Sequence, residues 1–221
     1  MQKFDTPAAI TAVVEIAAGR IQVIAADRTD TLVEVRPADP GKNRDVKAAA
    51  KATVTYQDGI LRVDGGQPGN QYFGPSGALE VTVQLPAGSA LKTRTASSEV
   101  RGVGRLGDVD VEGAYRHIKI DEAAAVRLAA VDGDVHIGRL NGPAQITTNR
   151  GAITVTEATT GNVVLHTHQG DITVTTAPGI PATLDAGTGH GRVANSLKND
   201  GTPTLAIRAT TTMGDITARS L

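Results

Sequence analysis

The sequence predicts an all-β fold, a single-stranded β-helix or solenoid with about 17–23 residues per coil. The first observation is a short phrase that recurs through the second half of the chain, in which a glycine and a mostly charged residue precede valine or isoleucine. The second is the alternation of apolar and polar residues around each copy, which is typical of half-buried strands. The third is the short period, which leaves no room for a helix in each repeat.

The valine or isoleucine of each copy serves as an anchor for aligning the repeats. The anchors are Val100, Ile118, Val135, Ile153, Ile172, Val193 and Ile216. Successive anchors are 18, 17, 18, 19, 21 and 23 residues apart. Four repeats also have apolar residues two positions after the anchor and seven and nine positions before it, which predicts two short strands per repeat facing one core. We expect the repeats to stack in sequence order as coils about 4.8 Å apart.

Two columns of residues accompany the anchors. The position two before the anchor is glycine in the last five repeats, which indicates a tight corner or a positive φ. The position one before it holds Glu99, His117, Asp134, Ala152, Asp171, Arg192 and Asp215. With coils in sequence order, Asp171 and Asp215 would both lie beside Arg192. We therefore expect this charged column to fix the register, although each exposed pair contributes only about 0–1 kcal/mol.

The long final intervals predict small loop insertions. The first is expected at residues 195–202, around Asn199, Asp200 and Gly201, and the second at residues 210–212.

Residues 1–90 are predicted to form an N-terminal β-strand region that is continuous with the repeat solenoid of residues 91–221. Alternating patterns predict strands near residues 14–16, 19–24, 32–35, 52–56, 60–63 and 79–85. Asp58 and Gly59 predict a hairpin turn, and residues 45–51 could form one or two helical turns. A long loop is expected at residues 64–77. Its aromatic residues, Tyr72 and Phe73, are expected to pack back onto the core, the alternative being an exposed contact site.

Composition excludes several classes of function. The chain of 221 residues has a net charge of −1, which gives no bias toward nucleic acid or an anionic membrane. It has no cysteine, which excludes disulfides, thiolate metal sites and a cysteine nucleophile. Aromatic residues are only 2%, which disfavours stacking on single-stranded nucleic acid or sugars. We find neither a signal peptide nor an apolar run long enough to span a membrane, and we expect a cytoplasmic protein.

The chain resembles a bacterial family of β-strand-repeat domains of unknown function that carries an adhesin label. The resemblance extends over nearly the whole chain and rests on three segments and the serial glycine phrases. The segments are Phe4–Pro7, Ala18–Val23 and Val81–Ser89. The resemblance implies an all-β solenoid, and it provides no catalytic or ligand-binding residue. The adhesin label would imply the cell surface.

Several motifs are candidates for chemical sites. Residues 102–107 fit Gly-x-Gly-x-x-Gly, but no βαβ pattern surrounds them, so we interpret them as turn glycines. His166 and His168 lie on one face of a strand, where zinc would need further ligands from neighbouring coils, and we expect solvated histidines instead. By alignment, Asn149 and Gly189 would flank His168, with His190 one position away.

Two groups of charged residues are further candidates for sites. Asp134, Asp171 and Asp215 are interpreted as architecture rather than as calcium ligands or paired catalytic carboxylates. Lys42, Arg44, Lys47 and Lys51 are matched by Asp39 and Asp45, as expected for a solvated loop.

We therefore expect a non-enzymatic β-solenoid scaffold or interaction protein, without catalytic, cofactor-binding or metal-binding residues. Its expected partner is another protein or a second copy, and not nucleic acid. One alternative is a self-assembling structural protein that pairs through the solenoid ends, because no amphipathic helix follows the final coil at residues 219–221. The other alternative is a polysaccharide-binding or polysaccharide-acting β-helix protein.

Overall fold

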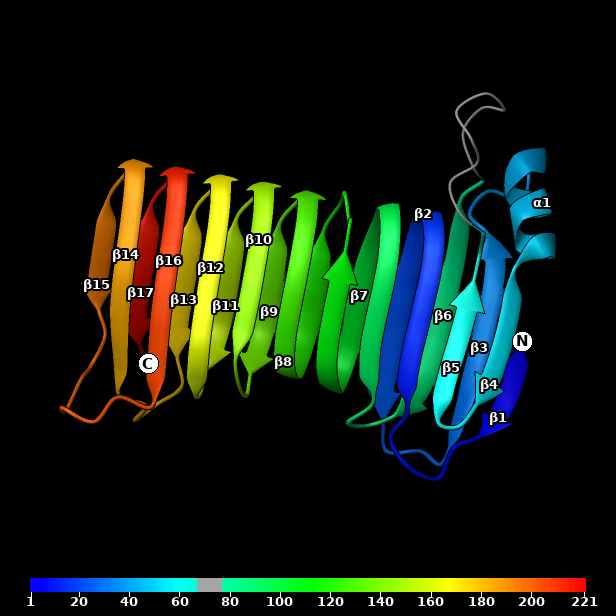
Figure 1. The fold of residues 1–221 in the computed structure, drawn as a ribbon, viewed down its shortest axis with the longest axis horizontal. Coiled ribbons are helices and arrows are strands. Elements are labelled where there is room, and N and C mark those ends of the chain that lie inside the picture. Colours follow the sequence, from blue (N-terminus) through cyan, green and yellow to red (C-terminus); the bar gives the residue numbers. More distant parts are fainter. Residues whose placement is uncertain (67–76) are drawn as a thin grey trace.

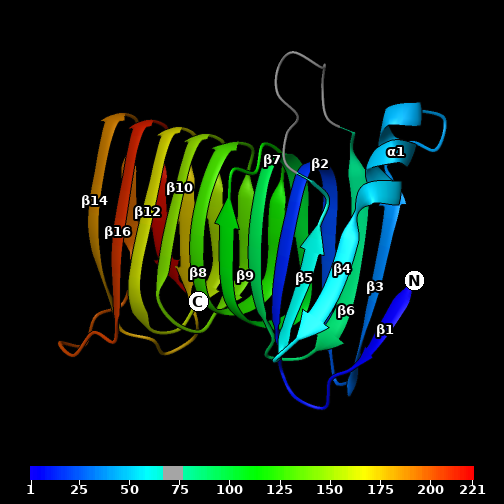
Figure 2. The same cartoon turned by 45° about the vertical axis from the view of Figure 1, so that its right-hand side comes forward.

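The computed structural model describes residues 1–66 and 77–221 and shows an elongated β-solenoid (Figures 1 and 2). The N-terminal strands are β1 Gln2–Asp5, β2 Thr11–Ala26, β3 Asp30–Pro37, β4 Thr53–Gln57, β5 Ile60–Asp64 and β6 Leu79–Pro86. A helix, α1 Asn43–Lys51, lies between β3 and β4. The repeat strands are β7 Ala90–Glu112, β8 Ile118–Asp132, β9 Val135–Leu140, β10 Ala144–Arg150, β11 Ile153–Ala158, β12 Gly161–Gln169, β13 Ile172–Thr176, β14 Ala182–His190, β15 Val193–Ser196, β16 Leu205–Met213 and β17 Ile216–Ser220. All these strands belong to one continuous sheet that winds around a core, which confirms the all-β solenoid.

Each coil of the repeat region contributes one strand to each of two parallel rows. The front row runs β8, β10, β12, β16, β14. The back row runs β8, β9, β11, β13, β17, β15, with β8 bending so that it takes part in both rows. Alternate residues of every strand therefore point between the rows, and the others point to solvent.

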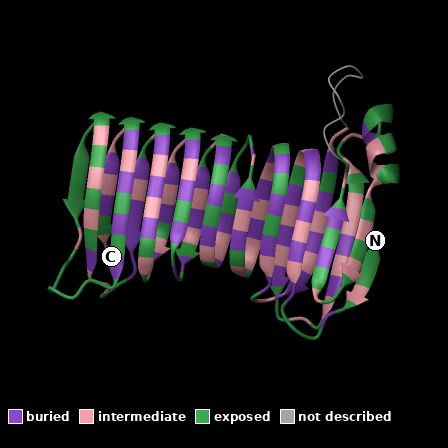
Figure 3. Cartoon of the chain, viewed as in Figure 1, coloured by how far each residue is buried: buried purple, intermediate pink, exposed green. Residues whose placement is uncertain are grey.

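The predicted anchors fill the space between the rows. Six of the seven anchors are at most 1% exposed, and the exception is Val193, which is 46% exposed. The alternation of buried and exposed bands is visible along the strands in Figure 3. The core is therefore a stack of aliphatic side chains, in which each coil is held chiefly by its neighbours.

The N-terminal end of the solenoid differs from the repeats because its strands pair antiparallel. β3 pairs with β6 and β1, and β4 pairs with β5. Asp58 and Gly59 have φ values of 52° and 75°, which confirms the predicted hairpin turn. The ring of Phe4 on β1 packs against that of Tyr56 on β4 with centroids 5.5 Å apart. Together with α1, which packs against β3 and β6, this aromatic pair closes the end.

An ion cluster ties β1 to β3 at this closed end. The carboxylate of Asp30 lies 2.7 Å from the guanidinium of Arg28 and 3.1 Å from the Lys3 ammonium. The hydrogen bond from Arg28, followed by that from Lys3, lowers the pKa of Asp30 below its ordinary value of 3.8. Because the folded state holds the carboxylate ionised more strongly than the unfolded state, the cluster stabilises the fold above that pH. The contribution is lost as the pH falls through the lowered folded-state pKa.

We expect Asp30→Asn to lower the melting temperature at neutral pH, and the difference from wild type to shrink as the pH falls below 3.8. Melting curves recorded across this range test the prediction. Asp27→Asn is the control, since Asp27 forms no ion pair within the described part of the chain. A difference for Asp30→Asn that is independent of pH would contradict the assignment.

The order of the last two coils corrects the prediction of sequence-order stacking. β16 lies between β12 and β14, and β17 lies between β13 and β15. The coil of residues 205–220 thus lies between the coil of residues 161–176 and the coil of residues 182–196, as Figure 1 shows. The predicted charge order is therefore wrong at this end, where Asp171 neighbours Asp215 and Arg192 lies outermost.

The side chains that point into the core explain this order. Where other coils have Ile120, Ile137, Val155, Val174 or Ala218, the coil of residues 182–196 has Asn195. Burying an amide without partners costs about 1–3 kcal/mol, whereas exposed neighbouring charges matter by about 0–1 kcal/mol. Sequence-order stacking would bury Asn195 and leave Ile207 at the exposed end. Apolar burial therefore outweighs the ideal charge alternation.

The insertion also relocates one of the predicted loops. The loop between β15 and β16, residues 197–204, lies close to the predicted insertion at residues 195–202. The prediction at residues 210–212 is wrong, because these residues lie within β16. The extra residues are instead at 177–181, between β13 and β14, where the chain crosses the position that the final coil fills.

The glycine column forms a corner that has no room for a side chain. Gly170 has a φ of +149°, and a Cβ there would lie 2.1 Å from the carbonyl oxygen of Gly151 in the adjacent coil. Threonine hydroxyls on the inner side of the corner donate to these carbonyls. Thr167 donates to Gly151 at 3.1 Å and Thr211 donates to Gly170 at 3.1 Å. The corner therefore holds consecutive coils together through main-chain contacts.

One buried hydroxyl in the core has no partner. Thr93 is 4% exposed, and its hydroxyl makes no hydrogen bond among the described residues. We expect Thr93→Val to raise the free energy of unfolding by about 1 kcal/mol, because it removes an unsatisfied polar group. Thr95→Val, two residues along the same strand, is the control: Thr95 bonds Ser98, so its loss should destabilise. Denaturant titration of both variants measures the two effects, and a stability loss at Thr93 would contradict the prediction.

Candidate functional site

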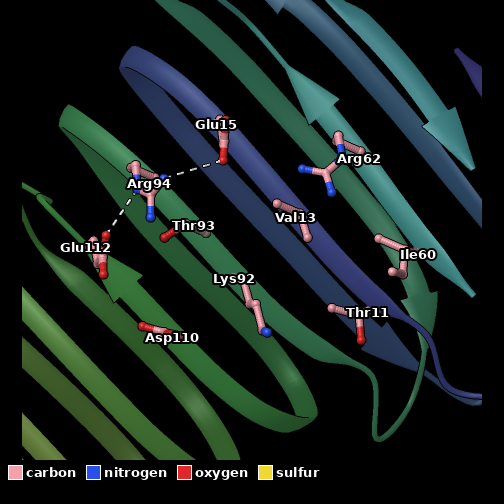
Figure 4. A pocket seen from close by; sticks show the side chains of 10 residues that line it. All are labelled: Thr11, Val13, Glu15, Ile60, Arg62, Lys92, Thr93, Arg94, Asp110 and Glu112. Carbon is pink, nitrogen blue, oxygen red and sulfur yellow. Dashed lines mark hydrogen bonds and ion pairs between the residues drawn. The ribbon is translucent and has the colours of Figure 1, made fainter. Parts of the chain in front are cut away.

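A groove of about 400 Å³ crosses the outer surface near the closed end of the solenoid (Figure 4). Its walls come from four adjacent strand segments, namely β5, the start of β2 and both arms of β7. The lining residues are Thr11, Val13, Glu15, Ile60, Arg62, Lys92, Thr93, Arg94, Asp110 and Glu112. Most of these residues point outward, because side chains alternate in direction along each strand. Charges of both signs therefore meet within the groove.

Arg94 is the centre of charge in this groove. Its guanidinium lies 3.1 Å from the carboxylate of Glu112 and 3.9 Å from that of Glu15, as the dashed lines of Figure 4 show. The hydrogen bond with Glu112, reinforced by the charges of Glu112 and Glu15, raises the pKa of Arg94. The cluster joins three neighbouring strand segments, and the Arg94 guanidinium stays charged at any physiological pH. Within the described residues, Lys92 and Arg62 form no ion pair and remain available to solvent.

A second depression of about 470 Å³ continues the groove toward β12. It shares Lys92 and Asp110 with the first and contains Arg127 and Gln145. Neither set of lining residues includes an aromatic side chain. The surface can therefore contact a polar partner through charges and hydrogen bonds, but it provides no ring on which a sugar could stack.

The aspartates of the charged column act as clamps between coils. The carboxylate of Asp134 accepts the N–H of Ala152 at 2.8 Å, and that of Asp171 accepts the N–H of Asp215 at 2.8 Å. Asp215 accepts the N–H of Arg192 at 2.9 Å. Each aspartate thus bonds the main chain of the next coil outward. This geometry supports the architectural interpretation of the three residues.

Two pairs in the same column lie within ion-pair distance. His117 Nδ1 is 3.8 Å from a carboxylate oxygen of Asp134, and the guanidinium of Arg192 is 3.6 Å from Asp215. Both pairs are largely exposed and therefore add little to the free energy of folding. Any role in fixing the register comes from where the paired groups lie.

The histidines of β12 are neighbours, with ring centroids 5.0 Å apart. His166 Nδ1 bonds the hydroxyl of Thr210 at 2.9 Å. Because of the inserted coil, β16 and not β14 flanks these histidines. Gly189 therefore does not flank His168 as predicted, and His190 is not one position away from that place. In the described parts of the chain, no three His, Asp or Glu side chains are grouped closely enough to hold a metal ion.

The remaining predicted candidates lie apart from the groove. Residues 102–107 are within the continuous strand β7, with no helix after them. Lys42 pairs with Asp39 at 3.0 Å, and Arg44 lies 3.6 Å from Asp45, whose carboxylate accepts the N–H of Ala78. Lys47 and Lys51 are exposed residues of α1. Tyr72 and Phe73 lie outside the described residues.

The terminal coil of residues 182–196 is the second candidate surface. β14 pairs only with β16, and β15 pairs only with β17, in the part of the chain that the structure describes. Leu184 and Ala186 are half-buried, whereas the equivalent inward residues of β16, Ile207 and Ala209, are buried. The coil thus leaves two strand edges and a partly apolar end surface open to a partner.

Comparison with known proteins identifies one domain family over most of the chain. The profile of a domain family described as Toastrack DUF4097 matches residues 13–220. No curated protein matches the chain. A provisionally named cell adhesion protein from Clostridium sporogenes is 14% identical with a TM-score of 0.44, over 100% of this chain and 98% of that chain. A provisionally named adhesin from Bacteroides fragilis is 13% identical with a TM-score of 0.42, over 98% of this chain and 95% of that chain.

Proposed function

The chain belongs to the Toastrack DUF4097 family, and on that premise we propose that it is a non-enzymatic scaffold that binds a partner protein at its terminal coil. The observation that carries the proposal is the contrast between the two ends of the solenoid. β1 and β4 at the N-terminal end also have a strand neighbour on one side only, but the Phe4–Tyr56 pair and α1 pack there. The coil of residues 182–196 has strand neighbours on one side only, and its inward residues Leu184 and Ala186 stay half-buried. Unpaired strand edges are templates for another strand.

The groove around Arg94 supports binding in preference to catalysis. Arg94 forms ion pairs with Glu15 and Glu112 on neighbouring strand segments, and, because its pKa is raised, it cannot release a proton to a substrate. Catalytic groups instead need a pKa near the working pH. The rigid stack of coils would hold both surfaces at a fixed separation, which suits a scaffold.

Affinity capture from an extract of the native cells tests the proposal. The baits are the wild-type protein, Val193→Lys and Val131→Lys. Val131 is 44% exposed at a coil corner and Val193 is 46% exposed on the terminal coil, so the two lysines are matched in type and exposure. We expect a partner that the wild type and Val131→Lys retain and Val193→Lys loses. Partners retained equally by Val193→Lys would contradict binding at the terminal coil.

We place this activity in the cytoplasm as part of the same proposal. A chain without cysteine needs no oxidising compartment for its stability. No helix in the described residues is long and apolar enough to cross a membrane. Fractionation of native cells tests the location, and recovery of the protein on the cell surface would overturn it.

A further inference from the structure

The two open edges of the terminal coil lie on opposite rows of the solenoid. β14 ends the front row and β15 ends the back row, as Figures 1 and 2 show. We infer that a second copy of this chain covers both edges at once, giving a dimer in which two terminal coils meet about a twofold axis. This inference rests on the proposed function and names the partner as a second copy.

The position of the edges favours an identical end over a single foreign strand. An extended peptide could pair with β14 or with β15, but it would leave the other row open. A second terminal coil presents one strand to each row. A twofold axis perpendicular to the long axis of the solenoid would make the strands of the two copies meet antiparallel. Antiparallel pairing is a stable arrangement for two strands.

The sequence of the edge strands permits close approach. β14 and β15 contain Asp185 as their only Asp, Glu, Lys or Arg residue, and they contain no proline. Asp185 is already paired with Arg208 of β16 at 2.9 Å. Edge strands that must stay unpaired usually carry lysine, proline or a bulge. By contrast, β1 at the other end carries Lys3 and Asp5.

The charges around the terminal coil balance in sign. Arg192 and Lys198 bring positive charge to the ends of β15, and Asp185 and Asp200 bring negative charge to the same end of the molecule. Two copies can therefore meet without net repulsion between like charges. The end surface also includes Asn195 and Thr188, so main-chain pairing would supply much of the interaction. We expect a reversible dimer that dissociates on dilution.

Head-to-tail assembly does not fit the structure. A filament would require the N-terminal end to accept the terminal coil. That end has antiparallel strands, and α1 packs beside β3 and β6 (Figure 1). β1 and β4 at that end also have a strand partner on one side only in the described part of the chain, but the Phe4–Tyr56 pair and α1 pack beside them. The two ends are thus different surfaces, and only like ends present the same pair of edges to each other. Assembly through the terminal coil would therefore close at two copies.

Light scattering of the purified protein over a range of concentrations provides the first test. The wild type and Val131→Lys should approach the mass of two chains at high concentration. Val193→Lys should keep the mass of one chain, because its ammonium would be buried between the copies. Circular dichroism establishes that each variant is folded.

Distances between spin labels provide the second test and distinguish the two symmetries. The chain has no cysteine, so Ala194→Cys and Thr154→Cys each give a single label. Thr154 lies three coils inward from Ala194 on the same row. In the twofold dimer, the distance between labels should increase by six strand spacings, about 29 Å, on moving from residue 194 to residue 154. In a head-to-tail assembly the two distances would be equal.

These outcomes separate the inference from the proposed function. A wild-type protein that stays monomeric at every concentration, or equal label distances, would overturn the twofold dimer. If such a monomer still retained a partner from the native extract that Val193→Lys lost, the proposed function would stand with a foreign protein at the terminal coil.

Discussion

Replacing Ile207 by aspartate should unfold both coils at the end of the solenoid. Ile207 is 2% exposed and lies between Val163 of β12 and Leu184 of β14. Loss of a buried isoleucine side chain costs about 2–5 kcal/mol, and a carboxylate in its place adds several more. Because coils interact mainly with their neighbours, residues 205–220 would detach together with residues 182–196, which they hold in place.

Hydrogen exchange resolved by segment measures this effect. We expect Ile207→Asp to abolish protection in residues 182–220, to expose the edges of β12 and β13, and to leave protection in residues 90–140 near the wild-type level. Ala206→Asp is the control, since Ala206 lies next to Ile207 in β16 but its side chain is exposed to solvent. Retained protection of β14 and β15 in Ile207→Asp would show that these strands pair elsewhere, and it would contradict the inserted order of the coils.

Replacing Gly170 by alanine should produce the second large loss of stability. The φ of +149° disfavours any side chain, and the new Cβ would lie 2.1 Å from the carbonyl oxygen of Gly151. The opposing atom is main chain, so the coils must separate to accommodate it. We expect a loss of about 2–4 kcal/mol in the free energy of unfolding, combining backbone strain with overpacking. The melting temperature should fall by on the order of 10 °C.

Gly187→Ala provides a matched comparison on β14. A Cβ at Gly187 meets no atom within 4 Å, and its φ lies outside the left-handed region. The melting temperature of this variant should stay within a few degrees of wild type. Equal effects of the two substitutions would mean that the corner does not constrain the stacking of the coils.

Much of the fold could be predicted because it depends on local patterns. A period-two alternation specifies which residues of a strand face the core, and a glycine that recurs at one position specifies the corner. Hence six anchors are buried as predicted, and the turn at Asp58 and Gly59 has the expected positive φ values. The short helix was indicated only weakly, because α1 depends on packing against β3 and β6 more than on its own sequence.

The stacking order of the last two coils could not be obtained from the repeat alone. Both coils fit the same pattern, and alignment along the sequence makes sequence order the natural expectation. One signal was available: Asn195 occupies a position that is aliphatic in the neighbouring repeats. A polar residue in a core column indicates a coil with one side open to solvent. Charge alternation favoured sequence order instead, but exposed ion pairs are too weak to decide the order of the coils.

The groove was not predicted because its residues come together only through the stacking of distant strands. Arg94 contacts Glu15 and Glu112, which lie 79 residues before it and 18 residues after it. No short motif brings these three together, and each reads alone as an ordinary surface charge. The His166 and His168 pair was identified correctly as two neighbours, but its surroundings depended on the coil order.

The inserted coil also determines the order in which the molecule can be completed during synthesis. Coils up to residue 176 can be added one after another as the chain emerges, since each docks on the coil made before it. Residues 182–196 cannot take their final place in this way, because residues 205–220, which support them, are made later. The emerging chain therefore carries this coil undocked until its support exists, and the last two coils join the solenoid as a single unit.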